Sequence, residues 1–177
     1  MDRFFVITGG PGSGKSTLIG ALAAEGFASM PEAGRAIIQD QVALGGSALP
    51  WADRRLFAEL MLGWELRSHH EAQTLAGPVF FDRGIPDVMG YLTLCGLPVP
   101  RHVRRAADAM RYHRRVFLAP TWPAIFAQDA ERKQTIDEAE ATSQALTGVY
   151  AGLGYEIVAL PLVPVAGRLR FVLSAIS

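Results

Sequence analysis

Short apolar runs alternate with longer amphipathic stretches along this chain. The apolar runs have the length and the β-branched or aromatic content of buried strands, and they predict strands over residues 3–8, 27–31, 78–81, 115–119 and 155–160. The stretches between them predict helices over residues 16–24, 33–43, 53–75, 86–95, 100–110, 131–153 and 164–176. This alternation is typical of an α/β fold with a mostly parallel sheet, in which ligands bind at the carboxyl ends of the strands.

The helix predicted over residues 53–75 is long and amphipathic. Leu56, Leu60 and Trp64 form one apolar stripe along it, with Phe57 and Met61 beside that stripe. We expect this helix and the loop before it to cover a substrate bound at the strand ends.

The first predicted strand leads directly into residues 9–17 (GGPGSGKST), and a helix follows. This order and the pattern G-x-x-x-x-G-K-S/T indicate a phosphate-binding P-loop, in which glycines let successive backbone N–H groups surround an anion at a helix N-terminus. Lys15 is expected to reach the β- and γ-phosphates, and Ser16 to ligate Mg²⁺. Thr17 is either an α-phosphate contact or a polar surface residue. The predicted nucleotide-binding residues are Gly10, Gly12, Ser13, Gly14, Lys15, Ser16 and Thr17.

Charged residues follow the second and third predicted strands. Asp82 ends an apolar run in the manner of a Walker B carboxylate, which holds Mg²⁺. Many P-loop hydrolases place a glutamate after that residue, but here the position is Arg83, which cannot activate water. Phosphoryl transfer to a bound acceptor is therefore favoured, with Glu32 as the base or clamp for the acceptor hydroxyl. The alternatives are helix-terminal carboxylates for Glu32 and Asp82 and a plain ion pair for Arg83.

Further charged residues are also candidates for the site. Arg35 lies one turn past Glu32, and Asp87 lies just inside the next helix as either a cap or a substrate contact. Arg132 is a candidate lid residue that would stabilise the transferred phosphoryl group, the alternative being a solvated helix start. Trp122 is a candidate for lining a base pocket.

Composition narrows the function classes. The 17 basic and 17 acidic residues cancel, so nucleic acid is not an expected partner. No run of 18 apolar residues predicts a membrane span, and no signal peptide is indicated. Cys95 is the one cysteine of the chain and cannot form an internal disulfide. Together with the ATP-type motif, this favours a location of the protein in the cytoplasm. The 177 residues suit a single domain over 1–177, with a lid near 121–135.

Several segments together resemble a known family. Residues 30–35 (MPEAGR), 79–87 (VFFDRGIPD), 128–132 (QDAER) and 154–156 (GYE) resemble the small AAA-type ATP-binding domain family, which is similar to the ribosylnicotinamide kinase domain of the bacterial NAD regulator. The chain also resembles, more loosely, nucleoside and nucleotide kinases. The resemblance implies a P-loop NTPase fold, a three-layer α/β/α sandwich with a five-stranded parallel sheet in the order 2-3-1-4-5, and an arginine-bearing lid.

The expected function is that of a Mg²⁺- and ATP-dependent kinase acting on a small hydroxyl acceptor, nucleoside-like by resemblance alone. The catalytic residues would be Lys15, Glu32, Asp82, Arg83 and Arg132, with Ser16 and Asp82 on the metal. The alternatives are a nucleotide-binding switch that acts through a protein partner and a slow NTPase. A Ras-like GTPase is disfavoured because no N/T-K-x-D signature occurs. The sequence does not decide whether the protein prefers ATP or GTP, and it does not give the oligomeric state.

Overall fold

A five-stranded parallel sheet forms the centre of the molecule in the computed structural model, which describes residues 2–125 and 135–176. Its strands are β1 (Phe4–Thr8), β2 (Ala28–Met30), β3 (Val79–Asp82), β4 (Arg115–Leu118) and β5 (Glu156–Ala159). They pair in the order β2-β3-β1-β4-β5, and every pairing is parallel. The sheet order implied by the family resemblance is therefore confirmed.

The helices lie between the strands, as the alternating pattern predicts. They are α1 (Lys15–Ala24), α2 (Ala33–Leu44), α3 (Arg54–Thr74), α4 (Ile85–Leu94), α5 (Arg101–Ala109), α6 (Ile136–Gly152) and α7 (Val165–Ile176), with a short 3₁₀ turn over Pro123–Ile125. Their bounds agree with the sequence expectation to within two residues, apart from the start of α6, where residues 131–134 lie outside the described part of the chain. Within the described ranges, no helix is both long and apolar enough to cross a membrane.

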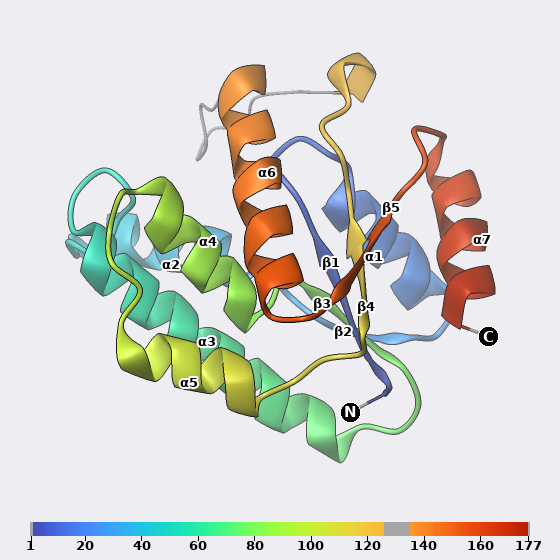
Figure 1. Cartoon of the computed structure of the whole chain (residues 1–177), viewed down its shortest axis with the longest axis horizontal. Helices are drawn as coiled ribbons and strands as arrows, with labels where there is room; N and C mark the ends of the chain where they lie inside the picture. Colours follow the sequence, from blue (N-terminus) through green and yellow to red (C-terminus); the bar gives the residue numbers. More distant parts are fainter. Residues whose placement is uncertain (1, 126–134, 177) are drawn as a thin grey trace.

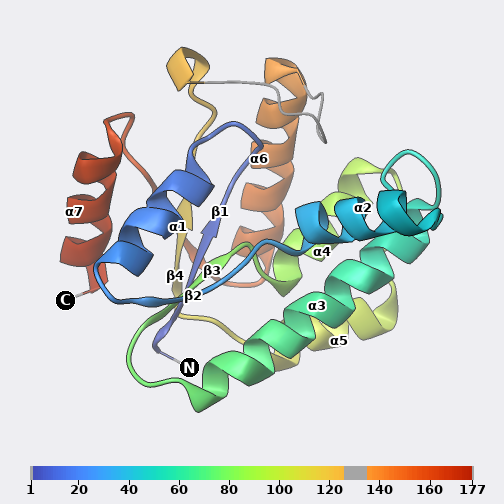
Figure 2. The same cartoon turned by 180° about the vertical axis from the view of Figure 1, so that it is seen from behind.

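Helices cover both faces of the sheet. Figures 1 and 2 show α1 and α7 together on one side of the molecule and α2 to α5 on the other. Successive strand side chains point to opposite faces. Phe4 and Val6 therefore join the core beneath α3, α4 and α6, while Phe5 and Ile7 join the core beneath α1 and α7. This double burial explains why β1 is apolar at every position before Thr8.

The buried face of α3 differs from the predicted stripe. Phe57 and Leu62 are buried, whereas Leu56 and Leu60 are 41% and 39% exposed. The physical reason is that α3 packs against α2 on one side and α4 on the other. The face shared by these neighbours lies one residue further round the helix, which corresponds to a turn of about 100°.

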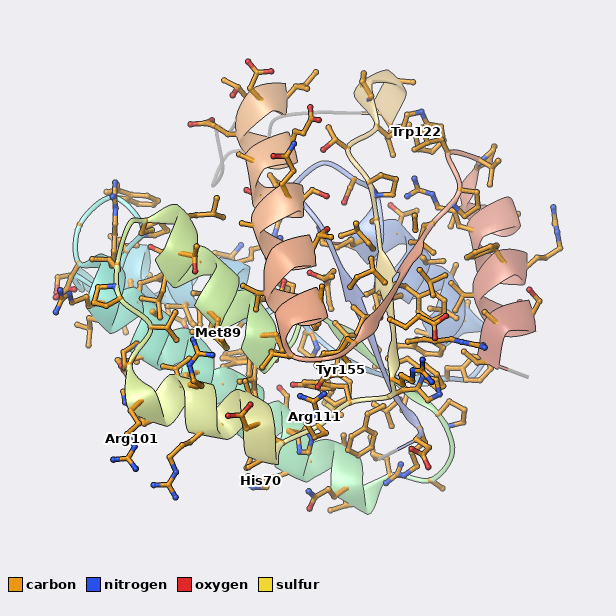
Figure 3. All side chains as sticks on the ribbon, in the orientation of Figure 1. His70, Met89, Arg101, Arg111, Trp122 and Tyr155 are labelled. Atoms are coloured by element: carbon orange, nitrogen blue, oxygen red, sulfur yellow. The ribbon has the colours of Figure 1, made fainter. Side chains whose placement is uncertain are left out.

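At the amino end of the sheet, a stacking contact joins the segment before β4 to the turn before β5. The Arg111 guanidinium lies 4.1 Å from the ring centre of Tyr155 and donates a hydrogen bond of 2.8 Å to the Leu153 carbonyl. Figure 3 shows Arg111 and Tyr155 side by side below α6. This arginine is therefore part of the fold and lies away from the carboxyl ends of the strands.

Candidate functional site

The glycine loop leaves β1 and enters α1 at the carboxyl end of the sheet, beside the start of α6 (Figure 1). Gly9 has a φ of 134°, and a Cβ there would collide with the backbone carbonyl of Ala119 after β4. A Cβ on Gly10 would lie 2.5 Å from the Ala139 carbonyl oxygen of α6. Glycine at these two positions therefore lets the loop pack directly against backbone on both sides.

Side chains within the loop fix its shape. Lys15 is buried, and its Nζ donates to the Gly10 carbonyl at 2.6 Å and lies 3.3 Å from Ser13 Oγ. Ser13 Oγ donates to the same Gly10 carbonyl at 2.8 Å. The ammonium group is thus held across the loop, at the place where a P-loop binds phosphate oxygens.

Helix α7 supports the loop from the other side. Arg168 is buried, and its Nη1 donates to the Ser13 carbonyl at 2.6 Å while its Nε donates to the Pro161 carbonyl at 2.9 Å. Its guanidinium lies 4.8 Å from the ring centre of Trp122 (labelled in Figure 3). Sequence reasoning missed Arg168. The signal was an arginine four residues before Val172, on the buried face of the final helix.

Asp82 and Ser16 form a candidate metal site. Ser16 Oγ lies 3.4 Å from Asp82 Oδ2, and Asp82 Oδ1 is buried without a hydrogen-bond partner in the structure as described. Burial raises the pKa of Asp82, and the positive charge of Lys15 opposes that rise. A buried carboxylate oxygen without a partner, beside a hydroxyl, fits Mg²⁺ bound jointly by protein and phosphate oxygens. Among the described residues, no cluster of three His, Cys, Asp or Glu side chains could hold a metal without such a ligand.

Arg83 joins the ends of β2 and β3. Its Nε donates to Glu32 Oε1 at 2.9 Å, and its Nη1 donates to Asp87 Oδ1 at 3.2 Å. Burial alone would lower the pKa of the guanidinium, but Glu32 and Asp87 outweigh burial and raise it. Arg83 has a φ of 77°, in the left-handed region that non-glycine residues rarely adopt. Such local strain is found mainly at functional sites.

Asp87 is the most fully bonded carboxylate of the site. Its Oδ1 accepts from Thr8 Oγ1 at 2.6 Å, and its Oδ2 accepts from the Tyr150 hydroxyl at 2.6 Å and the Gly84 amide at 3.0 Å. The bond to the Gly84 amide caps the N-terminus of α4. Asp87 therefore acts as a cap, one of the two interpretations left open by the sequence, while also lining the cavity described next.

A cavity of about 450 Å³ opens beside the loop. Its polar lining includes Glu32, Glu65, Arg83 and Asp87, and Pro11 of the P-loop also lines it. The apolar and aromatic part of the lining comes from α2, α3, α4, α6 and the loop before α3: Ile38, Trp51, Phe57, Met61, Tyr91, Leu94 and Leu146. The volume suits a nucleoside-sized molecule.

The predicted site residues fall into two neighbouring groups. Lys15, Ser16 and Asp82 lie around the loop, and Glu32 and Arg83 lie in the adjoining cavity. Arg132 lies outside the described residues, as does most of the predicted lid. The chemical roles of all these predicted site residues stay predictions.

Glu65 was missed by sequence reasoning. It is 4% exposed and faces the cavity from α3. The signal was available, because Glu65 follows Phe57 and Met61 at intervals of four and places an acid on their face of the helix.

Solved structures with this fold include nucleoside kinases. A structure of deoxyadenosine kinase from M. mycoides, with dCMP and dCDP bound, has a TM-score of 0.72 and 11% identity, over 97% of each chain. The same enzyme with dATP gives a TM-score of 0.59 and 13% identity, over 98% of each chain. The NadR protein in complex with NR gives 0.71 and 16% identity, over 99% of this chain and 50% of that one. At these identities the likeness establishes the fold.

The sequence itself gives a second comparison. A search of curated proteins returned no match. The model of the AAA domain family, in contrast, matches residues 4–168. This range includes the P-loop, the residues bonded to Arg83, and also Arg168. The chain therefore belongs to the AAA domain family.

Proposed function

We propose that this protein is a Mg²⁺- and ATP-dependent kinase that transfers the γ-phosphoryl group to a hydroxyl of a small, nucleoside-like acceptor. The observation that carries the proposal is the 450 Å³ cavity, because its lining includes both Pro11 of the P-loop and the Glu32–Arg83 ion pair. A molecule bound there lies next to the position of the terminal phosphate. A hydrolase or a switch needs no second ligand at that place.

The P-loop side of the site binds the nucleotide. Lys15 exchanges its contact with the Gly10 carbonyl for the β- and γ-phosphate oxygens, and the loop amides bind the same groups. Asp82 and Ser16 would hold Mg²⁺, which supplies charge neutralisation on the phosphate oxygens when it is bound. Arg168 keeps the Ser13 carbonyl turned away from the anion.

The cavity side of the site prepares the acceptor. The ion pair with Arg83 holds the Glu32 carboxylate in place, so that it can accept the proton of the acceptor hydroxyl. Within the described ranges, Arg83 Nη2 makes no hydrogen bond, and it can therefore donate to the transferred phosphoryl group. Arg132 is the proposed lid cation. Two proteins that share the fold support a nucleoside-like acceptor. The structure of M. mycoides deoxyadenosine kinase has dCMP and dCDP bound, and that of NadR is a complex with NR.

The test is ADP release from Mg·ATP in the presence of nucleosides, ribosylnicotinamide, sugars and amino alcohols. We expect at least one acceptor class to raise ADP release well above the basal rate, and Lys15→Ala to abolish the increase. Arg170→Ala, which removes an exposed cation from α7, is the matched control and should behave as wild type. Unchanged turnover in Lys15→Ala would refute the assignment. Flat ADP release across the panel would favour a switch or a slow NTPase.

A further inference from the structure

Glu65 is a buried acid in the cavity, and it has no ionic partner among the residues that the structure describes. It lies in the middle of α3, is 4% exposed and lines the cavity. It makes no hydrogen bond or ion pair with any residue that the structure describes, whereas Glu32 and Asp87 in the same cavity are both bonded to Arg83. An unpaired buried carboxyl is costly, so a fold rarely retains one without a use for it.

The charges around Glu65 are mostly negative. Asp87, Asp82 and Glu32 are its acidic neighbours, and Arg83 is the cation that opposes them. Burial is the main cause that raises the pKa of Glu65 well above its ordinary value, and Asp87 adds to the rise. Arg83 donates its hydrogen bonds to Glu32 and Asp87, and none of the described bonds joins it to Glu65. Among the residues that the structure describes, none donates a hydrogen bond to Glu65, so a bound ligand can supply hydrogen-bond donors or positive charge there.

The lining of the cavity as a whole also contains more acidic than basic side chains. Its charged side chains are the acids Glu32, Glu65, Asp87 and Glu138 and the arginines Arg54 and Arg83. Arg54 is exposed at the N-terminus of α3, and its Nε donates to the Pro50 carbonyl. A phosphorylated acceptor would need cations to pair with its phosphate, and in the described part of the cavity the acids outnumber the cations.

We propose that Glu65 is an acceptor-binding residue, and that the cavity takes an unphosphorylated nucleoside-sized acceptor, neutral or cationic, which presents O–H or N–H donors to Glu65. This inference rests on the proposed kinase function and makes it more specific, because it assigns the cavity to nucleosides rather than to nucleoside monophosphates. Phe57 and Met61, eight and four residues before Glu65, supply the apolar contact for the ring of the acceptor.

The experiment compares acceptors and variants at saturating Mg·ATP. The probes are cytidine, ribosylnicotinamide and cytidine 5′-monophosphate, and the readout is kcat and KM for ADP release. Glu65→Gln keeps the shape of the side chain and removes its charge. Glu71→Gln on the same helix is the matched control, because Glu71 is exposed and pairs with Arg67.

We expect wild type to prefer cytidine or ribosylnicotinamide to the monophosphate. Glu65→Gln should raise KM for the preferred acceptor roughly tenfold, since a hydrogen bond to a charged group is lost, and change kcat less. Glu71→Gln should match wild type. Preference for the monophosphate, or an unchanged KM in Glu65→Gln, would overturn the inference while leaving the kinase function standing.

Binding calorimetry separates this inference from the proposed function. If neither these probes nor the wider acceptor panel raises ADP release, the kinase assignment fails. Binding of cytidine or ribosylnicotinamide that Glu65→Gln weakens would still support Glu65 as a ligand-binding residue. Absence of binding by all three probes would overturn that role as well.

Discussion

At the scale of single residues, the site depends on how its buried carboxylates are bonded. Asp87 accepts hydrogen bonds from Thr8, Arg83, Gly84 and Tyr150, which belong to β1, the turn after β3 and α6. Each of these donors would lose a partner if the carboxylate were removed. Glu65, in the same cavity, makes no hydrogen bond with any of the residues in the described ranges. The two acids are therefore expected to affect stability in opposite directions.

Asp87→Ala should lower the free energy of unfolding by about 3–5 kcal/mol, because it breaks a buried ion pair and leaves buried hydroxyl groups unpaired. Urea denaturation measures the change. Asp108→Ala, at an exposed position on α5, is the control and should shift stability by less than about 0.5 kcal/mol. A comparably small effect of Asp87→Ala would contradict the structural role given to this carboxylate.

Glu65→Gln should raise the melting temperature, and the gain should grow with pH. The folded-state pKa of Glu65 is raised above the ordinary 4.5, so the folded protein retains a proton that the unfolded chain loses. Stability from this group is fully present below pH 4.5 and is lost as pH rises toward the folded-state pKa. Gln does not titrate. Calorimetry at pH 5 and pH 8 checks this, and a gain that is equal at both values would argue against an unpaired buried acid.

At the scale of elements, the P-loop is held between β4, α6 and α7. Gly10 contacts the backbone of α6, and Ser13 accepts from Arg168 of α7. The shape of the loop therefore depends on elements more than a hundred residues away in the sequence. Substitutions in the loop should act through these contacts even without nucleotide.

Gly10→Ala and Gly20→Ala should change stability with opposite signs. At Gly10 a new Cβ would meet the Ala139 carbonyl oxygen at 2.5 Å, so the loop and α6 must move apart and the protein loses stability and nucleotide affinity. At Gly20, inside α1, nothing lies within 4 Å of the new Cβ, and alanine should stabilise by about 0.5–1 kcal/mol. Thermal unfolding of both variants measures the contrast. A neutral Gly10→Ala would show that α6 does not confine the loop.

Element positions could be predicted from periodicity because each strand and helix carries its own local pattern. The buried face of α3 could not, since Leu56 and Phe57 are both apolar and only the packing of α2 and α4 decides between them. The partners of Arg83 were not predictable for a similar reason. Its contacts with Glu32 and Asp87 depend on which strands are neighbours in the sheet, and that is a property of the tertiary structure.

At the scale of the whole molecule, strand order brings the two halves of the site together. β1 lies next to β3, and β3 lies next to β2, so the P-loop, Asp82 and Glu32 meet along one edge of the sheet. The hydrophobic periodicity does not predict this strand order. The prediction of the order came from the family resemblance. The motifs located the nucleotide side of the site and, on the acceptor side, Glu32, Arg83 and Asp87. Glu65 needed the cavity, because it lies in the middle of a helix and belongs to no short motif.

The most direct test of the central claim is the destination of the γ-phosphoryl group. Wild-type protein is incubated with Mg·ATP labelled on the γ-phosphate and with the acceptor that most increases ADP release, and the labelled products are separated. A kinase places the label on the acceptor in proportion to ADP, and Lys15→Ala places none there. Label found only in inorganic phosphate, with the acceptor unmodified, would contradict the proposed phosphoryl transfer.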